Sequence, residues 1–369
     1  MVYMDYSKAF DVVSHEILLE KLRSLGFEDR IVSWVGDFLK DRVFEVSVGG
    51  CRSGGRVVLS GVPQGSVLGP LLFLVYVNHL TQGVSCSWKA FADDFKLYTF
   101  YSCDDFWDRS CALQRDLDSI VSVGNSWNLR VNPSKCVVMR FGSVLNRLGI
   151  DELFYCIDGR ALRVVDSYKD LGITVDKKLK FHAHIRTTVG KAGSLMNDLL
   201  RATVCRSPEF MVTLFVSHIR PILEFSSSVW NTGYLGDIRL LESLQRRWTR
   251  NVMGMENLEY GDRLRRLGLF SVYGRLLRID LVNIWKSFHR DIDIGLDRLF
   301  EMAPHVGTRG HSYKLSIPVC RSELRRRWFA VRCVSIWNGL PAEVVESDSL
   351  FVFKKGVEKK LGDKLFKFV

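Results

Sequence analysis

Two neighbouring aspartates, Asp93 and Asp94, stand between two apolar, β-forming segments in SWKAFADDFKLYTF. One explanation is a turn, because aspartate side chains hydrogen-bond to nearby backbone amides. A third carboxylate, Asp5, ends another apolar segment, VYM. Carboxylates at the ends of paired strands repel one another without a cation, and Mg²⁺ suits a site with few carboxylates, water and substrate phosphates. Two such ions about 4 Å apart activate a hydroxyl and stabilise a leaving pyrophosphate, so the pattern indicates phosphoryl transfer from a nucleotide.

Short-range patterns predict the elements that position these carboxylates. VYM is typical of a strand, and SHEILLEKLRSLGF predicts a helix that Ser14 caps and Gly26 ends. A second helix is expected over residues 29–41, a glycine-turned hairpin over 43–62, and an uncharged loop over 61–66 that leads into a core helix ending near Asn78. A helix over 104–127 carries one apolar stripe, formed by Phe106, Leu113, Leu117 and Ile120.

The rest of the chain changes from strand patterns to helix patterns. Residues 128–142 predict a strand, an Asn-Pro turn and a second strand, and residues 155–176 predict a hairpin with Asp158-Gly159 at its turn. Helical periodicity follows over 181–203, 208–219, 236–253 and 272–290. The fold class expected is therefore α+β, with an antiparallel sheet in the first half and a mostly α-helical second half.

The positive charge is confined to the second half of the chain. The 369 residues carry a net charge of +11, yet residues 1–180 contain 22 basic and 22 acidic side chains, against 30 and 19 in residues 181–369. Such asymmetry favours a polyanionic partner of the second half, nucleic acid before membrane. The other explanation is a basic surface that only keeps the protein soluble.

Cysteine usage and hydropathy favour an intracellular protein. The nine cysteines show no CxxC pair, and His182 with His184 lacks further metal ligands nearby. Residues 57–88 contain no charged side chain, but the glycines and prolines of SGVPQGSVLGP interrupt them, and LLFLVYV is shorter than the roughly 20 residues of a membrane span. We expect no signal peptide and no membrane partner, and a nuclear or nucleocytoplasmic location.

Several segments in order resemble the reverse transcriptases of non-LTR (LINE-type) retrotransposons. The palm motifs are matched by YMDYSKAFDVVSH, GVPQGSVLGPLLFLVYVN, FADD and LRVNPSKCVVMRF, and YKDLGITVD resembles the primer grip. The segments RRRWFAVRCVSIWNGLP and FKKGVEKKL resemble the C-terminal end of the same polyproteins, nearest the CR1/Jockey-like groups. The resemblance covers nearly the whole chain. It implies an RNA-directed DNA polymerase that uses two Mg²⁺ ions and deoxynucleoside triphosphates to extend a DNA primer on an RNA template.

The resemblance also assigns roles to residues near the carboxylates. Asp5, Asp93 and Asp94 match the metal-binding aspartates, and Lys135 matches a lysine proposed to protonate pyrophosphate. Phe10 matches the aromatic gate that excludes a ribose 2′-hydroxyl, while Gln64 and Gly65 match residues beside the incoming nucleotide. Without the resemblance, Phe10 is explained as a core aromatic residue, Lys135 as a solvated turn lysine and the glycine-rich loop as a turn before a helix.

The remaining assignments concern nucleic-acid contacts. Tyr168, Leu171 and Gly172 match the primer grip, although ordinary hairpin packing explains them equally well. Arginines flank tryptophans at two places, which suits phosphate contact and base stacking. The alternative is a core tryptophan with a solvated flank of arginines. These candidate nucleic-acid-binding residues are Arg246, Arg247, Arg250, Arg325, Arg326 and Arg327.

The predicted organisation is a palm with the primer-grip hairpin over 1–180, a basic helical thumb and connection over 181–300, and a basic C-terminal helical region over 301–369. Only four residues precede Asp5, so we expect the fingers and an upstream endonuclease to be absent. We also expect the strand that carries Asp5 to be short and to lack a pairing strand. One alternative to an active polymerase is an inactive retroelement remnant that binds nucleic acid through its basic half. A further alternative, a gene model that starts too late, would restore the active polymerase. The sequence predicts no particular oligomeric state.

Overall fold

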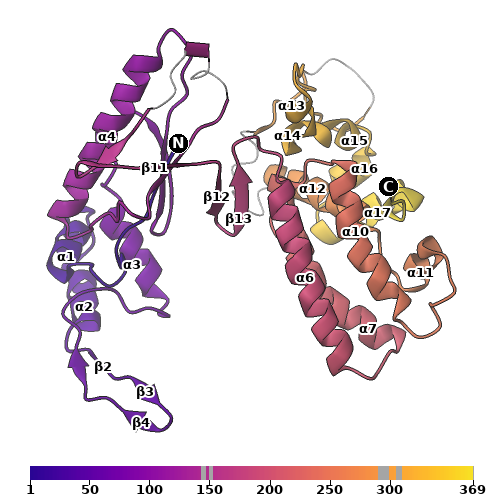
Figure 1. Cartoon of the computed structure of the whole chain (residues 1–369), viewed down its shortest axis with the longest axis horizontal. Helices are drawn as coiled ribbons and strands as arrows, with labels where there is room; N and C mark the ends of the chain where they lie inside the picture. The colour runs from indigo at the N-terminus through magenta and orange to yellow at the C-terminus, as the bar shows by residue number, and fades with distance from the viewer. Residues whose placement is uncertain (143–146, 149–152, 290–298, 305–309, 369) are drawn as a thin grey trace. The chain divides into compact units, whose positions relative to one another are not determined.

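The computed structural model describes the chain except for residues 143–146, 149–152, 290–298, 305–309 and 369 (Figure 1). It divides into two compact units, Met1–Tyr168 and Lys169–Val369. The first unit has 18 Lys and Arg against 20 Asp and Glu, and the second has 34 against 21. The whole positive excess therefore belongs to the second unit. None of the helices in the described ranges is both long and apolar enough to cross a membrane.

A five-stranded sheet in the order β11-β8-β1-β7-β6 forms the centre of the first unit. Its strands are β1 (Val2–Met4), β6 (Ser87–Phe91), β7 (Asp94–Tyr98), β8 (Val137–Met139) and β11 (Arg163–Val165). The strand β1 pairs antiparallel with both β7 and β8, and β6 pairs antiparallel with β7. The α+β class is confirmed. Two expectations were wrong: β11 runs parallel to β8, and β1 has a partner on each side.

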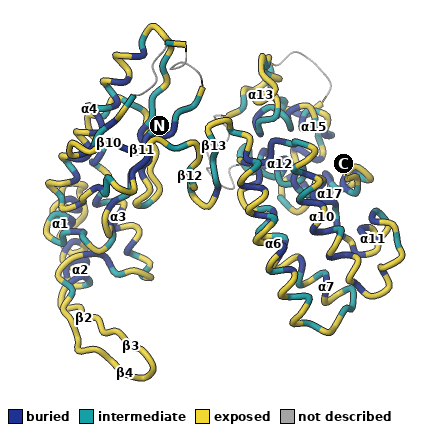
Figure 2. The backbone as a smooth tube through the Cα atoms, in the orientation of Figure 1, coloured by how far each residue is buried: buried dark blue, intermediate teal, exposed yellow. Residues whose placement is uncertain are grey.

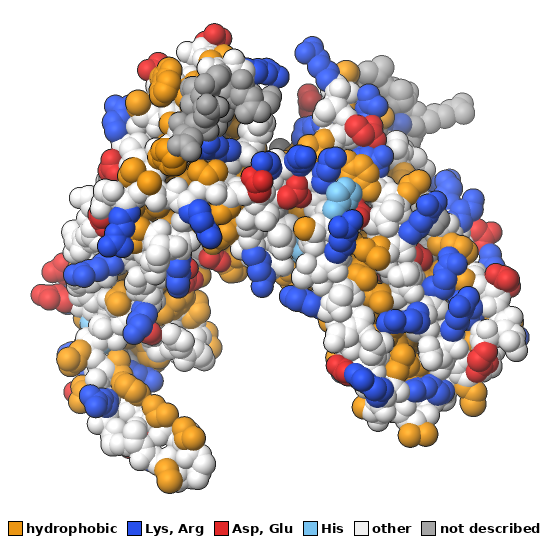
Figure 3. Space-filling model, in the orientation of Figure 1, with side chains coloured by type: hydrophobic (Ala, Val, Ile, Leu, Met, Phe, Trp, Pro, Cys, Tyr) orange, Lys and Arg blue, Asp and Glu red, His pale blue; other side chains and the backbone are white. Residues whose placement is uncertain are grey.

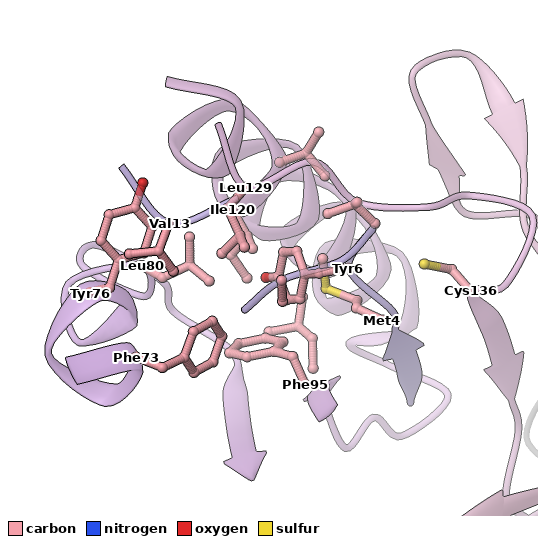
Figure 4. Close-up of a cluster of buried hydrophobic side chains, with 14 of the residues drawn as sticks. Met4, Tyr6, Val13, Phe73, Tyr76, Leu80, Phe95, Ile120, Leu129 and Cys136 are labelled. Carbon is pink, nitrogen blue, oxygen red and sulfur yellow. The ribbon is translucent and has the colours of Figure 1, made fainter. Parts of the chain in front are cut away.

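The longer helices beside the sheet, in the part of the chain that the structure describes, each follow their sequence pattern. They are α1 (His15–Ser24), α2 (Asp29–Leu39), α3 (Leu68–Val77) and α4 (Phe106–Ser126). The hydroxyl of Ser14 caps α1 by accepting from the amide of Ile17, and Gly26 follows α1 with φ +82°. All four stripe residues of α4 are buried. Three of them, Leu113, Leu117 and Ile120, pack with residues of β1 and α3 in the core in which Figure 4 shows Tyr6, Phe73 and Phe95.

Hairpins make up most of the remaining first unit. The strands β2 (Val43–Phe44), β3 (Ser47–Val48), β4 (Cys51–Arg52) and β5 (Arg56–Val57) form the predicted glycine-turned ribbon, which is exposed along its length (Figure 2). The strands β9 (Cys156–Ile157) and β10 (Arg160–Ala161) turn at Asp158-Gly159, both at positive φ, as predicted. The prediction of a strand before the Asn-Pro turn is wrong. Only a single bridge forms there, between Tyr6 and Val131.

The second unit begins within the hairpin of β12 (Ser167–Asp170) and β13 (Ile173–Asp176) and is otherwise mostly helical. Its longer helices are α6 (His182–Ala202), α10 (Leu235–Arg250), α12 (Val272–Phe288) and α17 (Leu350–Leu361). Four predicted helical segments are confirmed by α6, α7 with η1, α10 and α12, although residue 290 lies outside the described residues. Shorter helices complete the unit: α7 (Pro208–Leu214), η1 (Phe215–Ile219), α8 (Arg220–Glu224), α9 (Ser227–Trp230), α11 (Tyr260–Arg266), α13 (Glu323–Arg327), α14 (Phe329–Arg332), α15 (Val334–Asn338), α16 (Ala342–Val345) and η3 (Gly362–Leu365).

The helix α12 joins two hydrophobic clusters of the second unit. Its first half packs into the cluster of residues 173–276, and its second half into the cluster of residues 281–365. Three of its charged side chains form ion pairs with side chains of other helices in the described part of the chain. Arg275 binds Glu224 of α8 through two hydrogen bonds of 2.7 and 2.6 Å, and Arg278 binds Glu358 of α17 at 2.8 Å.

The third polar link of α12 is buried. Both oxygens of Asp280 accept hydrogen bonds from Arg332 of α14, at 2.9 to 3.0 Å, and one also accepts from Ser228 at 2.9 Å. Burial raises the pKa of Asp280, and the Arg332 charge opposes that rise. The pair therefore ties the C-terminal helices to α12 through a desolvated ion pair.

We expect Arg332→Leu to lower the free energy of unfolding by about 3–5 kcal/mol, because it leaves the Asp280 carboxylate buried without its counter-ion. The double variant Asp280→Asn/Arg332→Leu removes both charges and should recover most of this loss. Urea titration followed by circular dichroism measures both, with the exposed Arg326→Leu as the control, expected within about 0.5 kcal/mol of wild type. Equal losses in the single and double variants would contradict this account.

A second test concerns Lys21 on α1, which is only 9% exposed. Its ammonium donates to the carbonyl of Tyr76 and lies over the Tyr76 and Trp127 rings. Burial lowers its pKa from 10.5 to about 8. Between these two pH values the unfolded chain binds more protons at this residue, so the free energy of unfolding rises with pH in that window.

Relative to Lys21→Met, the wild-type chain should therefore gain on the order of 3 kcal/mol of stability between pH 8 and 10.5. Urea titrations across this range measure the difference, and the exposed Lys40→Met serves as the control. A stability difference that stays constant with pH would show that Lys21 titrates normally in the folded chain.

Candidate active site

The three predicted metal-binding carboxylates lie at one end of the central strands. The ladder of β1 with β7 ends at the pair Met4 and Phe95, and Asp5 and Asp94 are the next residues of the two segments. The β6–β7 hairpin turns at Ala92 and Asp93, where Ala92 has φ +52°, a region that residues with a side chain rarely adopt. Asp93 and Asp94 are exposed, and Phe95 points into the core (Figure 4). The register thus aligns Asp5 with the Asp-Asp turn.

The backbone of Asp5 is held by the loop that leads into β8. The amide of Asp5 donates to the sulfur of Cys136 at 3.4 Å, and its carbonyl accepts from the amide of Asn132 at 2.8 Å. Burial raises the pKa of the Cys136 thiol, which keeps the sulfur neutral beside the aspartate. Asp5 therefore has little freedom in its main chain, although its side chain is 35% exposed.

The side chain of Asp5 has one close cation. The ammonium of Lys135 lies 3.3 Å from Asp5 Oδ1. The same oxygen is buried and accepts no hydrogen bond from the residues that the structure describes. Lys135 is placed by a turn in which Asn132 Oδ1 accepts from the amide and hydroxyl of Ser134, at 3.1 and 2.6 Å. The structure therefore brings Lys135 next to Asp5, and the resemblance assigns both residues to the same site.

The residues predicted to contact the nucleotide lie where residues 10–11 meet the loop 60–66. Phe10 is half-buried, and its ring stacks on Phe73 with centroids 4.3 Å apart. The carbonyl of Phe10 accepts from the amide of Val62 at 2.9 Å. Gly61, at φ +92°, passes so close that an added Cβ would lie 2.8 Å from the carbonyl oxygen of Asp11. Position 61 therefore requires glycine, because any side chain there would collide with the backbone of residues 10–11.

Gln64 and Gly65 lie at the exposed tip of this loop. The amide nitrogen of Gln64 donates to Asp11 Oδ1 at 2.9 Å, and the hydroxyl of Ser60 donates to the Asp11 carbonyl at 2.8 Å. Gly65 has φ +78° with open space around its missing Cβ. Asp11 therefore holds the side chain of Gln64 to the segment that follows Asp5.

The predicted primer-grip residues fall on both sides of the boundary between the units. Tyr168 belongs to the first unit, where its ring packs against Tyr3 of β1 with centroids 4.3 Å apart. Leu171 and Gly172 form the turn between β12 and β13, at φ +44° and +86°. Leu171 is exposed, and a Cβ added at Gly172 would lie 3.2 Å from the ring of Phe225 in the second unit.

The predicted arginines around Trp248 have different surroundings. Trp248 itself is buried in the core of the second unit. The Arg246 guanidinium lies against the adjacent rings of Tyr260 and Phe368, 4.7 and 4.8 Å from their centroids, and Arg247 donates to Asn197 at 3.2 Å. Arg250 is exposed at the end of α10. Arg246 thus has an internal role in packing the C-terminal residues.

The second arginine group lies on and near α13. Arg325 stacks over Trp328 at 4.3 Å, while Arg326 and Arg327 pair with Glu323 at 3.4 and 2.8 Å. Arg327 also donates to the carbonyl of Gly233 at 3.0 Å and lies over the Tyr234 ring. The three arginines therefore differ in their contacts within the protein, and Arg327 makes the most of them.

Comparison with known proteins decides the family. Residues 1–175 match the family described as reverse transcriptase (RNA-dependent DNA polymerase). Residues 1–175 belong to the reverse transcriptase family. The match contains all three carboxylates, Lys135, the loop 60–66 and both turn residues of the β12–β13 hairpin.

Relatives extend the similarity beyond the reverse transcriptase domain. The RNA-directed DNA polymerase from mobile element jockey of Drosophila melanogaster is 30% identical over 268 residues, or 68% of this chain and 28% of the relative. The probable RNA-directed DNA polymerase from transposon BS of the same fly is 29% identical over 289 residues, 75% of this chain and 31% of the relative. The Pol polyprotein from type-1 retrotransposable element R2 of Popillia japonica is 24% identical, covering 68% and 42%. The sequence is of LINE type, and it spans about a third of the length of these relatives.

One residue that positions the reverse transcriptase hairpin escaped the sequence analysis. Asp116 of α4 is buried, and one of its oxygens accepts from the amides of Ser85 and Cys86 and from the Ser85 hydroxyl, at 2.7 to 3.0 Å. Burial acts to raise the pKa of Asp116, but these hydrogen bonds outweigh it and lower the pKa. The start of β6 is thus fixed to α4. The sequence contained one indication of this role, because Asp116 is a carboxylate placed between the buried stripe residues Leu113 and Leu117.

Gly61 and Gly65 offer a matched pair for testing how the reverse transcriptase loop is held. Both have positive φ, but only Gly61 lacks room for a Cβ. We expect Gly65→Ala to lower the free energy of unfolding by about 1 kcal/mol, from backbone strain alone. Gly61→Ala should cost at least about 2 kcal/mol more, because the Asp11 and Phe10 carbonyls must move. Urea titration measures the free energy of unfolding of both variants. Equal losses in Gly61→Ala and Gly65→Ala would show that the loop is not packed against residues 10–11.

Proposed function

We propose that this chain carries the palm and thumb of an RNA-directed DNA polymerase that extends a DNA primer on an RNA template. The observation that carries the proposal is the β1–β7 register, which aligns Asp5 with the Asp93-Asp94 turn in a domain of the reverse transcriptase family. Two of the relatives are named as RNA-directed DNA polymerases of mobile elements. We assign the palm to residues 1–180, the thumb and connection to 181–300 and a C-terminal region to 301–369.

Divalent metal use is general for the family, and we propose that two Mg²⁺ ions serve this chain. Within the described ranges, no three His, Cys, Asp or Glu side chains converge to hold an ion unaided. The donor chemistry nevertheless fits. Asp5 Oδ1 is a buried carboxylate oxygen that accepts no hydrogen bond from any described residue, and Asp93 and Asp94 are both exposed. Bound ions of this kind activate the attacking hydroxyl and stabilise leaving pyrophosphate. Asp5, Asp93 and Asp94 are the residues that would hold them.

The other residues of the site would orient the nucleotide and move a proton. Lys135, whose ammonium lies 3.3 Å from Asp5, is placed to donate a proton to the leaving group. The stacking of Phe10 on Phe73 fixes a ring beside the Asp5 strand, as selection against a 2′-hydroxyl requires. Gln64 and Gly65 present a polar tip to the nucleotide, and Tyr168 with Leu171 and Gly172 would hold the primer.

Nucleic-acid binding by the second unit is supported by its excess of 13 positive charges. We assign phosphate contacts first to exposed arginines such as Arg250, Arg325 and Arg326, since Arg246 and Arg327 already bind inside the protein. Figure 3 shows Lys and Arg side chains distributed over the visible face of this unit. Binding should weaken steeply with added salt, because phosphate contacts release counter-ions.

Primer extension on an RNA template with Mg²⁺ and deoxynucleotides tests the proposal. Asp93→Asn/Asp94→Asn should abolish extension, because it removes the charges that would hold the metal. The matched control is Asp104→Asn/Asp105→Asn, which alters the same dipeptide before α4 and should retain activity. Circular dichroism checks that all three chains fold.

Absence of extension by the folded wild-type chain, or equal activity in the Asp93→Asn/Asp94→Asn variant, would overturn the proposal. A chain that extends no primer but binds RNA–DNA hybrid in a salt-sensitive way would instead support the alternative of an inactive remnant.

A further inference from the structure

The charged side of α12 carries more cations than carboxylates where it meets α8 and α17, and Figure 1 shows α12 and α17 side by side. Glu224 and Glu358 are the carboxylates, and they are bound by Arg275 and Arg278. Three more cations interact electrostatically with these pairs or with each other. Two of the five positive charges are thus compensated, and three are not. The α12 cation cluster consists of Arg220, Arg275, Arg278, Lys286 and Lys354.

Arg220 is the member of the cluster whose hydrogen-bonding groups are least satisfied. Its side chain is 16% exposed, and its guanidinium lies 5.8 Å from the centroid of the Phe215 ring. Arg220 Nε is 3.8 Å from Glu224 Oε1, too far for a hydrogen bond, and both oxygens of Glu224 accept from Arg275. The same Nε is buried and donates to no residue that the structure describes. A guanidinium has only donors, and burying one without an acceptor is costly.

An irregular turn of the backbone places Arg220 in the cluster. The helix α7 continues through η1 into α8 without a break, and η1 is a π-helix. Its wider turn rotates the side chains that follow relative to those that precede it, and Arg220 is the first residue after it. Turns of this kind are rare and are frequent at functional sites. The fold therefore accepts an irregular helix and a buried unpaired arginine at the same position.

The uncompensated cations repel their neighbours. Burial lowers the pKa of Arg220, and the charges of Arg275 and Arg278 lower it further, against the effect of Glu224. Burial also lowers the pKa of Lys354, with the charges of Arg278 and Lys286 acting in the same direction. In the described part of the chain, Glu224 and Glu358 do not balance these cations. An added anion would relieve the repulsion.

The arrangement of the cations favours a chain of anions over a single one. Arg275, Arg278 and Lys286 follow one another along α12, and the Cα atoms of the first and last are about 16 Å apart at the rise of an α-helix. Phosphate groups suit such a row, because their oxygens accept charge-assisted hydrogen bonds from arginine and lysine. The match to the reverse transcriptase family ends at residue 175, so the whole cluster lies beyond that domain.

We propose that the α12 cation cluster binds consecutive phosphates of a nucleic-acid strand, with Arg220 as the ligand that the free protein leaves without an acceptor. The inference rests on the proposed binding of nucleic acid by the second unit, and it names where on that unit the strand lies. Phosphate oxygens take the place of the missing acceptors at Arg220 and Lys354. Glu224 and Glu358 keep Arg275 and Arg278 in position beside them.

Binding of a labelled RNA–DNA hybrid, followed by fluorescence anisotropy at several salt concentrations, tests the site apart from catalysis. Arg220→Gln and Lys354→Gln should each weaken binding roughly tenfold, the loss expected for one charge-assisted contact. Each should also reduce the slope of log affinity against log salt by about 1, because one phosphate contact is lost. The control Lys359→Gln/Lys360→Gln removes two exposed cations of α17 and should bind as the wild-type chain does.

Thermal unfolding with inorganic phosphate is a second test, and it needs no nucleic acid. In chloride, Arg220→Met should melt no lower than wild type, because it removes an unpaired buried charge and keeps a side chain against Phe215. Replacing chloride by phosphate at equal ionic strength should raise the melting temperature of wild type more than that of Arg220→Met. This pair of results separates a lost anion ligand from a damaged fold.

Hybrid affinity and salt slope that are unchanged in Arg220→Gln, or weakened equally in the control, would overturn the inference. So would stabilisation by phosphate that depends on Arg220 while hybrid binding does not, since the cluster would then serve a free phosphate or a phosphorylated protein. If the chain extends no primer yet binds the hybrid through Arg220, the polymerase proposal fails and this site stands. Extension by a chain whose hybrid binding is independent of Arg220 would leave the polymerase and remove the site.

Discussion

The pairing of one three-residue strand determines where the chemistry of this protein can take place. β1 hydrogen-bonds to β7 on one side and β8 on the other, so Asp5 emerges between the Asp93-Asp94 turn and the loop of Lys135. A shift of one residue in either ladder would point Asp5 to the opposite face of the sheet. The contacts of Cys136 and Asn132 with the Asp5 backbone reinforce this register. The alignment of a reverse transcriptase site thus depends on main-chain pairing more than on side-chain packing.

Local patterns predicted most elements of the fold. Ser14, Gly26 and the α4 stripe mark helices through interactions within a few residues, and Asp158-Gly159 marks a turn through its own backbone preferences. The choice of strand partners was less predictable. The parallel pairing of β11 with β8, and the reduction of an expected strand to the Tyr6–Val131 bridge, depend on contacts between distant segments that leave no periodic trace.

The same division applies to the site. Asp5, Asp93 and Asp94 were found from residue type and spacing, whereas Lys135 was assigned by the resemblance to reverse transcriptases. The structure brings Asp5 and Lys135 together across 130 positions of sequence. The roles of Asp11 and Asp116 were missed, because each acts through a partner 30 or more residues away. Arg246 and Arg327 were predicted to bind nucleic acid but contact aromatic rings within the protein. The sequence does not distinguish the two cases, because an arginine near an aromatic residue gives the same pattern in both.

The polar links of α12 have a consequence for how the second unit loses its structure. Two hydrophobic clusters would ordinarily allow two melting steps, one for each. Here Arg275, Arg278 and Asp280 connect one helix to α8, α17 and α14, so neither cluster can open without breaking ion pairs that the other supports. The helical half should therefore behave as a single cooperative block, in which residues near the C-terminus share the protection of residues one hundred positions earlier.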